Sequence, residues 1–302
     1  MKRTLGLTLL LFATLFSCMR QEKPLPAELS RAESVMWEHP DSALSILRSM
    51  PQSSLSSGKN YATWALLLAQ ARDKVYGKRL PDSLNIPSSD KLVQDAMDYF
   101  EKEGNLKRMA QTYYYKGQLL KDQKKITEAM PFFLKSKEMM TKLDEPLFTY
   151  LICQSLGNTY RYQDLYEESL VQLKDAYQYA LRSGNGERIS YALSELGRTY
   201  VHKNEMDSAL FYFGKSLDNA QRLGNIELEA MAMGELGVVY NKLSQGEKAL
   251  HYTRKELDLC LQISSLHKLP QVYYKIGSAF WSLGQLDSAK VYFQKSLETD
   301  NL

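Results

Sequence analysis

The residue types that carry most enzyme chemistry occur in this sequence, but not in the spacing that such chemistry needs. The four histidines are His39, His202, His251 and His267. None has the near neighbours that a metal site requires. Asp-Ser pairs such as Asp207-Ser208 stand before apolar helical runs, where helix capping is the expected role and an activated hydroxyl is not. No glycine-rich phosphate loop or nucleophile elbow occurs. We therefore expect no enzyme, no bound metal and no cofactor.

Five glycines provide the frame in which the other polar residues can be placed. They stand 40 residues apart, at Gly117, Gly157, Gly197, Gly237 and Gly277. Large apolar or aromatic residues stand three after each glycine and, in four cases, one before it. These positions share a helical face, so each glycine lies inside a helix. A helical glycine costs about 1 kcal/mol relative to alanine and is tolerated where two backbones approach. The expected packing partners are the small residues twelve positions on, Ala129, Ser169, Ala209, Ala249 and Ala289.

Each period continues with a short break and a second helical run, as in the segment from Asn204 to Leu210. Gly184 and Gly224 are placed to end second helices. One period is therefore a helical hairpin, and a single hairpin cannot cover its own apolar face, so successive hairpins stack. The predicted fold class is all-α, an α-solenoid of stacked antiparallel helical hairpins with a 40-residue period. No Gly/Ser/Pro-rich stretch marks an internal boundary, which predicts one continuous body.

The first helices form the inner wall of such an array, at the positions three before and one, four and five after each glycine. Amide, cationic and aromatic side chains are common there. Amides can pair with the backbone of an extended peptide, and arginines and aromatics often dominate interface energy. The candidate partner-binding residues are Tyr114, Gln118, Gln154, Asn158, Arg161, Arg198, His202, Asn241, Tyr274 and Trp281. For each of them, simple solvation of a groove is the alternative.

The runs Leu156-Gly157-Asn158-Thr159-Tyr160 and Leu196-Gly197 through Tyr200, each followed by a small residue (Ser169, Ala209), resemble the tetratricopeptide repeat. The resemblance covers roughly residues 106–302, as five repeats, although the period exceeds the usual length of about 34 residues. It implies binding of an extended peptide, with Asn158 holding peptide backbone. Gln154 stands where a lysine would be needed to clamp a C-terminal carboxylate, so that ligand class is not expected.

Residues 27–105 match the repeat less well. The run Pro40-Asp41-Ser42-Ala43-Leu44 resembles the start of a second helix, and Tyr61 to Tyr76 an intact first helix. The loop from Pro81 to Pro87 breaks the register. We expect two degenerate hairpins that cap the array, as terminal repeats commonly do.

The N-terminus has the form of an export signal over residues 1–17. A basic start, Met1-Lys2-Arg3, precedes the apolar run from Thr4 to Phe16. As a helix this run is about 20 Å long, short of the roughly 30 Å hydrocarbon core. The run Leu15-Phe16-Ser17-Cys18 resembles a lipobox. The resemblance implies cleavage before Cys18, acylation of Cys18 with palmitate among the chains, and a lipidated linker over residues 18–26. An ordinary signal with an incidental cysteine is the alternative.

This layout resembles that of repeat lipoproteins of Bacteroidota, which implies a lipid-anchored protein of the cell envelope. The segment from Met19 to Lys23 lacks the acidic run of a surface-export tag, which favours the outer membrane with the body facing the periplasm. Longer relatives end in a membrane helix and a DNA-binding regulator that this sequence lacks. We therefore expect a protein-protein interaction adaptor with a protein or peptide partner, and the alternative is a sensory module. The oligomeric state stays open, a homo-oligomer included.

Charge and cysteine content exclude further classes. Loss of residues 1–17 removes Lys2 and Arg3, so the formal charge falls from +3 to +1. A nucleic-acid binder would carry a basic stripe, so no nucleic acid is expected, and the membrane is contacted through the lipid only. Cys153 and Cys260 lie two repeats apart, too far for a disulfide, and are expected to be small buried hydrophobes.

Overall fold

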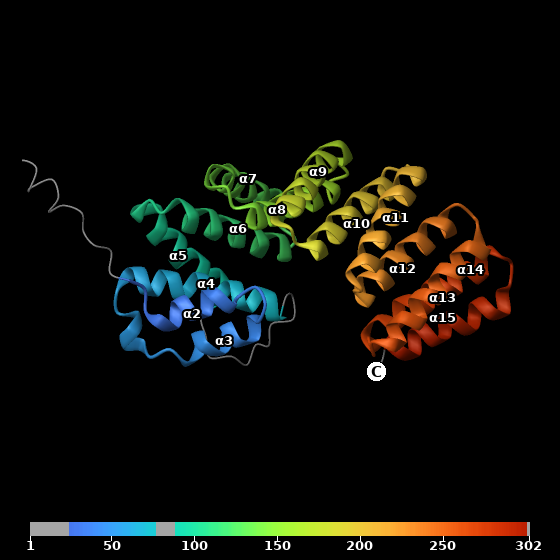
Figure 1. The fold of residues 1–302 in the computed structure, drawn as a ribbon, viewed down its shortest axis with the longest axis horizontal. Helices are drawn as coiled ribbons and strands as arrows, with labels where there is room; N and C mark the ends of the chain where they lie inside the picture. The colour runs from blue at the N-terminus through green and yellow to red at the C-terminus, as the bar shows by residue number, and fades with distance from the viewer. Residues whose placement is uncertain (1–23, 77–87, 301–302) are drawn as a thin grey trace, which may run out of the picture. The chain divides into compact units, whose positions relative to one another are not determined.

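All regular structure in the described part of the chain is helical (Figure 1). The computed structural model describes residues 24–76 and 88–300. The predicted signal segment, Cys18 and the loop from Pro81 to Pro87 lie outside these ranges. None of the helices within the ranges has both the length and the hydropathy that a membrane crossing needs.

Contacts divide the chain into two compact units, Met1–Tyr99 and Phe100–Leu302. The structure differs here from the single continuous body that the composition predicts. The division falls inside one helix, α5 (Ser89–Glu103). A boundary within a regular helix needs no glycine or proline, so it leaves no trace in the composition.

The N-terminal unit is built from short helices around α4 (Gly58–Tyr76). Helix α2 (Ala27–Val35) packs against α3 (Pro40–Ser49), and both pack against α4. A short 3₁₀ helix, η1 (Gln52–Leu55), joins α3 to α4. Helix α3 begins at Pro40 because proline suits the first helical position. The helices expected at Pro40 and over Tyr61 to Tyr76 are therefore confirmed.

The second unit consists of five helical hairpins, as the glycine spacing predicts (Figure 1). Each first helix packs against its own second helix, which in turn packs against the first helix of the next repeat. The repeats, numbered 1 to 5, are α6 (Leu106–Asp122) with α7 (Ile126–Leu143), α8 (Pro146–Arg161) with α9 (Tyr166–Ser183), α10 (Gly186–His202) with α11 (Met206–Leu223), α12 (Ile226–Lys242) with α13 (Gly246–Gln262), and α14 (Leu269–Ser282) with α15 (Leu286–Asp300). A 3₁₀ turn, η2 (Leu266–Lys268), precedes α14.

First helices of neighbouring repeats also touch one another, in the order α6, α8, α10, α12 and α14. We call the surface that these five helices share the first-helix wall. Because the period is constant, residues at one repeat position come from neighbouring helices of this wall. The sequence positions chosen as candidates are therefore positions on one continuous wall.

The turn inside each hairpin requires a left-handed residue at the same place. Four of these are not glycine, namely Lys124, Asp164, Asn204 and Ser244, with φ between 57° and 65°. In repeat 5 the residue is Gly284. Gly184 and Gly224, expected to end second helices, have φ of 67° and 62° and are confirmed as left-handed caps.

The repeated glycines fit against a bulky side chain, which corrects the packing partner expected from the sequence. A Cβ built at Gly197 would lie 2.6 Å from Cε1 of Phe213, and one at Gly157 would lie 2.6 Å from Cγ of Leu173. The close neighbour is thus sixteen positions on. The residue twelve positions on contributes only backbone, as Ser169 does with its carbonyl oxygen at 3.3 Å from the Gly157 site. Removing the Cβ makes room for a ring or branched side chain of the second helix.

Helix starts also differ from expectation. Helix α11 begins without a side-chain cap, and Asp207 lies in its first turn, where a carboxylate favours the positive end of the helix dipole. Side-chain caps occur instead on first helices. Asn185 accepts a hydrogen bond from the Arg188 N–H, and Asn225 from the Leu228 N–H, each at 3.0 Å. The Gly-Asn pairs of the sequence therefore end one helix and begin the next.

Candidate functional site

The ten candidate residues lie on the first-helix wall, but they do not converge on one point. They are spread over all five first helices, with the polar residues on α6, α8, α10 and α12 and the exposed aromatic ones on α14. Their environments fall into three groups: a paired centre, a cavity beside it, and an aromatic end.

The centre of the wall is a ladder of ion pairs that crosses three repeats. Arg161 on α8 binds Glu195 on α10, with Nη2 2.7 Å from Oε2. Glu195 also accepts from Arg198 Nη1 at 2.7 Å, and Arg198 reaches Glu235 on α12, with Nη2 2.6 Å from Oε1. Arg161 Nη1 makes further bonds to the Glu195 carbonyl (3.3 Å) and the Thr199 hydroxyl (3.2 Å). The ladder therefore ties α8, α10 and α12 together.

This ladder is electrically balanced and largely buried. The side chains of Arg161 and Glu195 are each 11% exposed. Burial disfavours the charged guanidinium of Arg198, but Glu235 and Glu195 outweigh this effect, so the pKa of Arg198 is raised. Two arginines face two glutamates, so the centre offers no free charge. Arg161 and Arg198 thus have a clear structural role, and sequence reasoning missed their partners Glu195 and Glu235. The sequence does contain a signal for these partners, since a glutamate stands two positions before the repeated glycine in two successive repeats.

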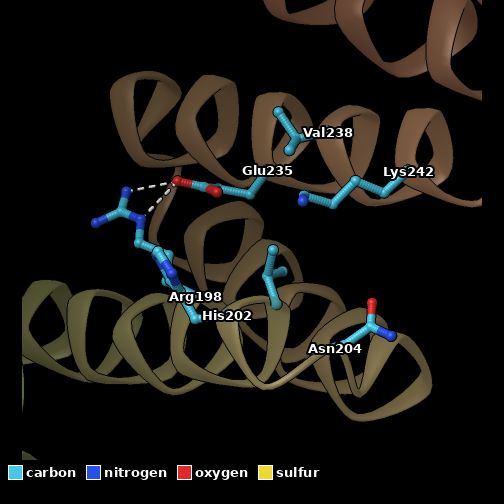
Figure 2. A pocket seen from close by; sticks show the side chains of 7 residues that line it. Arg198, His202, Asn204, Glu235, Val238 and Lys242 are labelled. Atoms are coloured by element: carbon cyan, nitrogen blue, oxygen red, sulfur yellow. Dashed lines mark hydrogen bonds and ion pairs between the residues drawn. The ribbon is translucent and has the colours of Figure 1, made fainter. Parts of the chain in front are cut away.

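A cavity of about 450 Å³ opens beside the ladder, between α10 and α12. Figure 2 shows Arg198 on α10 and Glu235 on α12 joined by an ion pair across the space between the two helices. The cavity is lined by Arg198, Val201, His202, Asn204, Glu235, Val238 and Lys242. Two of the lining residues, Arg198 and His202, were candidates from the sequence, and Lys242 stands at the predicted wall position five after Gly237. The other lining residues were not predicted from the sequence.

His202 lies at the rim of this cavity. Its ring stacks on Tyr166, with centroids 6.3 Å apart. Partial burial lowers the pKa of His202, and the positive charges of Arg161 and Lys242 lower it further against the opposing effect of Asp164. The imidazole is therefore held neutral to lower pH than a free histidine, and an added negative charge would reverse that effect.

Two asparagines of the wall carry an unused buried acceptor. Oδ1 of Asn158 and Oδ1 of Asn241 are shielded from solvent and accept no hydrogen bond. A shielded acceptor without a partner typically costs about 1–3 kcal/mol. An asparagine amide nitrogen can donate to a peptide carbonyl, which is the role expected of Asn158.

The aromatic candidates separate into one buried and two exposed residues. Tyr114 is only 5% exposed, and its ring contacts those of Tyr115, Phe133 and Phe148. Its ring thus belongs to the core, and its hydroxyl accepts from Gln118 Nε2 at 3.0 Å. Tyr274 and Trp281 on α14 are 60% and 64% exposed. Large exposed aromatics seven residues apart share one helical face.

The remaining candidates are polar and half-buried. Gln118 Oε1 accepts from the Ser155 hydroxyl of the next first helix at 3.5 Å, and Gln154 lies beside it on α8. Cys153 and Cys260 are free and buried, as expected. Burial raises the pKa of Cys153 to about 12, so its thiol is no nucleophile. In residues 24–76 and 88–300 no three His, Cys, Asp or Glu side chains are grouped as a metal site would need.

A family model of the tetratricopeptide repeat matches residues 110–139 and 270–301, which fall in repeats 1 and 5. These two segments are similar to the tetratricopeptide repeat. Between the matched segments, three further hairpins share the same period and packing. A search of curated proteins finds no match.

Solved structures with the same arrangement support the α-solenoid. The apo form of RapI is similar with a TM-score of 0.67 at 15% identity, over 91% of this chain and 96% of that chain. NprR in complex with its cognate peptide NprX gives 0.67 at 15% identity, over 92% and 79%. The signal transduction ATPase with numerous domains from Pyrococcus horikoshii, which has a tetratricopeptide repeat sensor, gives 0.69 at 16% identity, over 91% of this chain and 41% of that chain. At these identities the likeness concerns the fold, and it confirms the predicted fold class.

Proposed function

We propose that this protein is an interaction adaptor that holds an extended segment of a partner protein along the first-helix wall. The observation that carries the proposal is the exposure of Tyr274 and Trp281 on a wall that also has an open cavity between α10 and α12. Large exposed aromatic residues are costly to leave in water, and they are the residue types that interfaces use most.

The similar structures support the same class of function. NprR was solved with its cognate peptide, and a Rap protein with Competence and Sporulation Factor; the latter has a TM-score of 0.66 at 13% identity. A fold of this kind therefore accommodates a bound peptide. A sensory role is the second candidate, since the Pyrococcus horikoshii structure carries its repeats as a sensor. In such a role the ladder across α8, α10 and α12 would couple ligand binding to the packing of three repeats.

The proposal includes a location. The export signal and Cys18 support a lipid anchor in the cell envelope, with the repeats on the periplasmic side of the outer membrane. A Cys18→Ala variant should lose incorporation of labelled palmitate and leave the membrane fraction. Retention of both label and membrane association by Cys18→Ala would refute the anchor and leave the adaptor function untouched.

Photo-crosslinking in cells tests the adaptor function itself. A photoreactive residue placed at Asn158 on α8 probes the wall, and one at Lys174 on α9 is the control, since Lys174 is exposed on a second helix of the same repeat. We expect a protein to be captured from position 158 and not from position 174. Equal capture from both positions, or none from position 158, would contradict the proposal.

A further inference from the structure

Helix α15 differs from the other second helices on the side with which those helices contact the following repeat. In repeat 3 this side belongs to one apolar cluster with Leu236 and Val239 of α12, and its residues are Met206, Leu210, Phe213 and Leu217. The residues at the same repeat positions of α15 are Leu286, Lys290, Phe293 and Leu297. We call these four residues the α15 strip. Their spacing of four, three and four places them on one side of the helix.

The α15 strip is apolar at three of its four positions and is open to solvent. Leu286 and Leu297 are 57% and 68% exposed. Phe293 is half-buried, whereas Phe213 at the same repeat position is fully buried. Removing large apolar side chains from water is favourable, so a second surface that covers the strip would be stabilised.

Lys290 makes the strip a poor match for the kind of helix that covers the other second helices. The residues at its position in repeats 1 to 4 are apolar, namely Met130, Leu170, Leu210 and Leu250. A helix that covered α15 as α12 covers α11 would place apolar side chains against the ammonium group. Burying a charge against apolar side chains alone is costly. The covering surface must therefore suit a cation as well as leucine and phenylalanine side chains.

The strip is complementary to a second copy of itself. Its spacing of four, three and four reads the same in both directions, so a two-fold axis that sets two α15 helices antiparallel superposes one strip on the other. Leu286 then lies against Leu297 of the second copy, and Lys290 lies against its Phe293. The face of an aromatic ring attracts a lysine ammonium group, so the one charge of the strip has a suitable neighbour.

The charges on α15 favour the antiparallel direction. In a parallel pair each residue would meet its own counterpart, and Lys290 would lie against Lys290. The antiparallel pair avoids this repulsion, and it brings the exposed Asp287 of each copy near the exposed Lys295 of the other. Steps of four and three are also the spacing of a coiled-coil seam, in which a single lysine fixes the register at some cost in stability.

We propose that α15 pairs with α15 of a second copy of this chain in an antiparallel, two-fold contact. The inference does not rest on the proposed function, because the α15 strip belongs to a second helix and not to the first-helix wall. One helix from each copy makes a small interface, so we expect monomer and dimer to exchange at concentrations on the order of micromolar.

Cysteine crosslinking between two differently tagged full-length copies tests the contact and its direction. One copy carries Leu286→Cys and the other Leu297→Cys, and both are expressed in the same cells, which are then treated with a mild oxidant. We expect a disulfide-linked dimer that contains both tags. Two copies that both carry Leu286→Cys should not be linked. In the antiparallel pair these positions are about 16 Å apart along the helix, and a disulfide needs Cα atoms within about 7 Å.

Matched variants connect the dimer to the strip. Leu297→Glu places a carboxylate in both outer layers of the contact. We expect it to weaken the dimer at least about tenfold in sedimentation of the full-length chain in density-matched detergent. Val171→Glu is the control, since Val171 is 56% exposed on α9. It should leave the dimer unchanged, and thermal melts of both variants check that the fold is kept.

Four results would overturn the inference. They are a monomer at concentrations far above the micromolar range, linkage of two Leu286→Cys copies as efficient as that of the mixed pair, equal weakening of the dimer by Val171→Glu, and crosslinks from the strip to other proteins only. Each of these results leaves the adaptor function untouched, because that function is read out at positions of the first-helix wall.

Discussion

The centre and the end of the first-helix wall use residues typical of binding surfaces in opposite ways. In the centre, the guanidinium groups of Arg161 and Arg198 are bound by glutamates of the neighbouring repeats. At the end, Tyr274 and Trp281 leave more than half of their surface in water. The centre therefore holds the repeats to one another, while the end has surface still to bury. The residue type alone does not decide between these two roles. A wall residue is structural where a side chain of the neighbouring repeat binds it, and it is available to a partner where none does.

The largest effect should come from breaking the ladder at Glu195. Glu195→Ala leaves Arg161 buried without a carboxylate, and we expect a loss of about 3 kcal/mol in the free energy of unfolding, measured by urea denaturation. Glu235→Ala occupies the same repeat position and is the matched control. Arg198 keeps Glu195 in that variant and is 33% exposed, so the loss should be nearer about 1 kcal/mol. Equal losses of unfolding free energy in the two variants would show that the buried Arg161–Glu195 pair matters no more than the more exposed Arg198–Glu235 pair.

The end of the wall should show the reverse pattern. We expect Trp281→Ala to weaken binding of a captured partner by about 2 kcal/mol, roughly thirtyfold, because exposed tryptophans are common energetic anchors of interfaces. The free energy of unfolding of Trp281→Ala should differ from that of the unmodified protein by less than about 0.5 kcal/mol. Phe211→Ala is the control, since this ring is 56% exposed on α11, a second helix. A partner that loses affinity equally with Phe211→Ala does not bind the wall.

The same glycine-to-alanine substitution should destabilise the centre of the wall more than its end, because the centre is more tightly packed. Gly197→Ala places a Cβ 2.6 Å from the fully buried Phe213, and we expect a cost of about 1–2 kcal/mol after the gain in helix propensity. Gly277→Ala meets Phe293 at 2.7 Å, but this ring is only half-buried in repeat 5 and can shift. Thermal melts should therefore rank Gly277→Ala as the milder change. The opposite ranking would show that repeat 5 is packed as rigidly as repeat 3.

The smallest effect concerns pH. Arg161, Lys242, Asp164 and Tyr166 lie around His202, and partial burial, together with the two cations, holds its pKa below the ordinary value of 6.5. The unfolded chain therefore binds a proton at His202 more readily, so the stability that this difference gives is present above the unfolded pKa and is lost as the pH falls through the folded one. Urea denaturation at about pH 7.5 and 5.5 should show a smaller loss of stability for His202→Gln than for the unmodified protein. An equal loss in both would show that the surroundings of His202 do not hold it neutral.

The sequence predicted the helical hairpins well because their signal is local and repeated. The glycine spacing fixed five periods, and Gly184 and Gly224 marked helix ends that the structure confirms. The same local information failed for packing. Whether residue twelve or sixteen lies against a glycine depends on how two helices cross, and the ring of Phe213 covers Gly197 from the next turn.

The sequence predicted which residues occupy wall positions, but it did not predict which side chains surround them. Arg161 and Glu195 stand 34 residues apart in the chain, so their pairing appears only when repeats 2 and 3 are stacked. Tyr114 likewise has a wall position, but its ring is covered by Phe148 of the next first helix. The cavity between α10 and α12 depends on both helices and on the turn after α10, which explains why Asn204 was not predicted to line it. Lys242 has a predicted wall position, five after Gly237, but was not among the ten candidates.

The central claim, that a partner segment lies along the first-helix wall, is tested most directly by mapping crosslinks from two wall positions in the same cells. Photoreactive residues at Asn158 and Trp281, on α8 and α14, are analysed by mass spectrometry of the captured peptides. We predict that both positions capture one continuous segment of one protein, and that position 174 captures none of it. Capture of unrelated proteins at the two wall positions, or of the same segment from position 174, would contradict the claim.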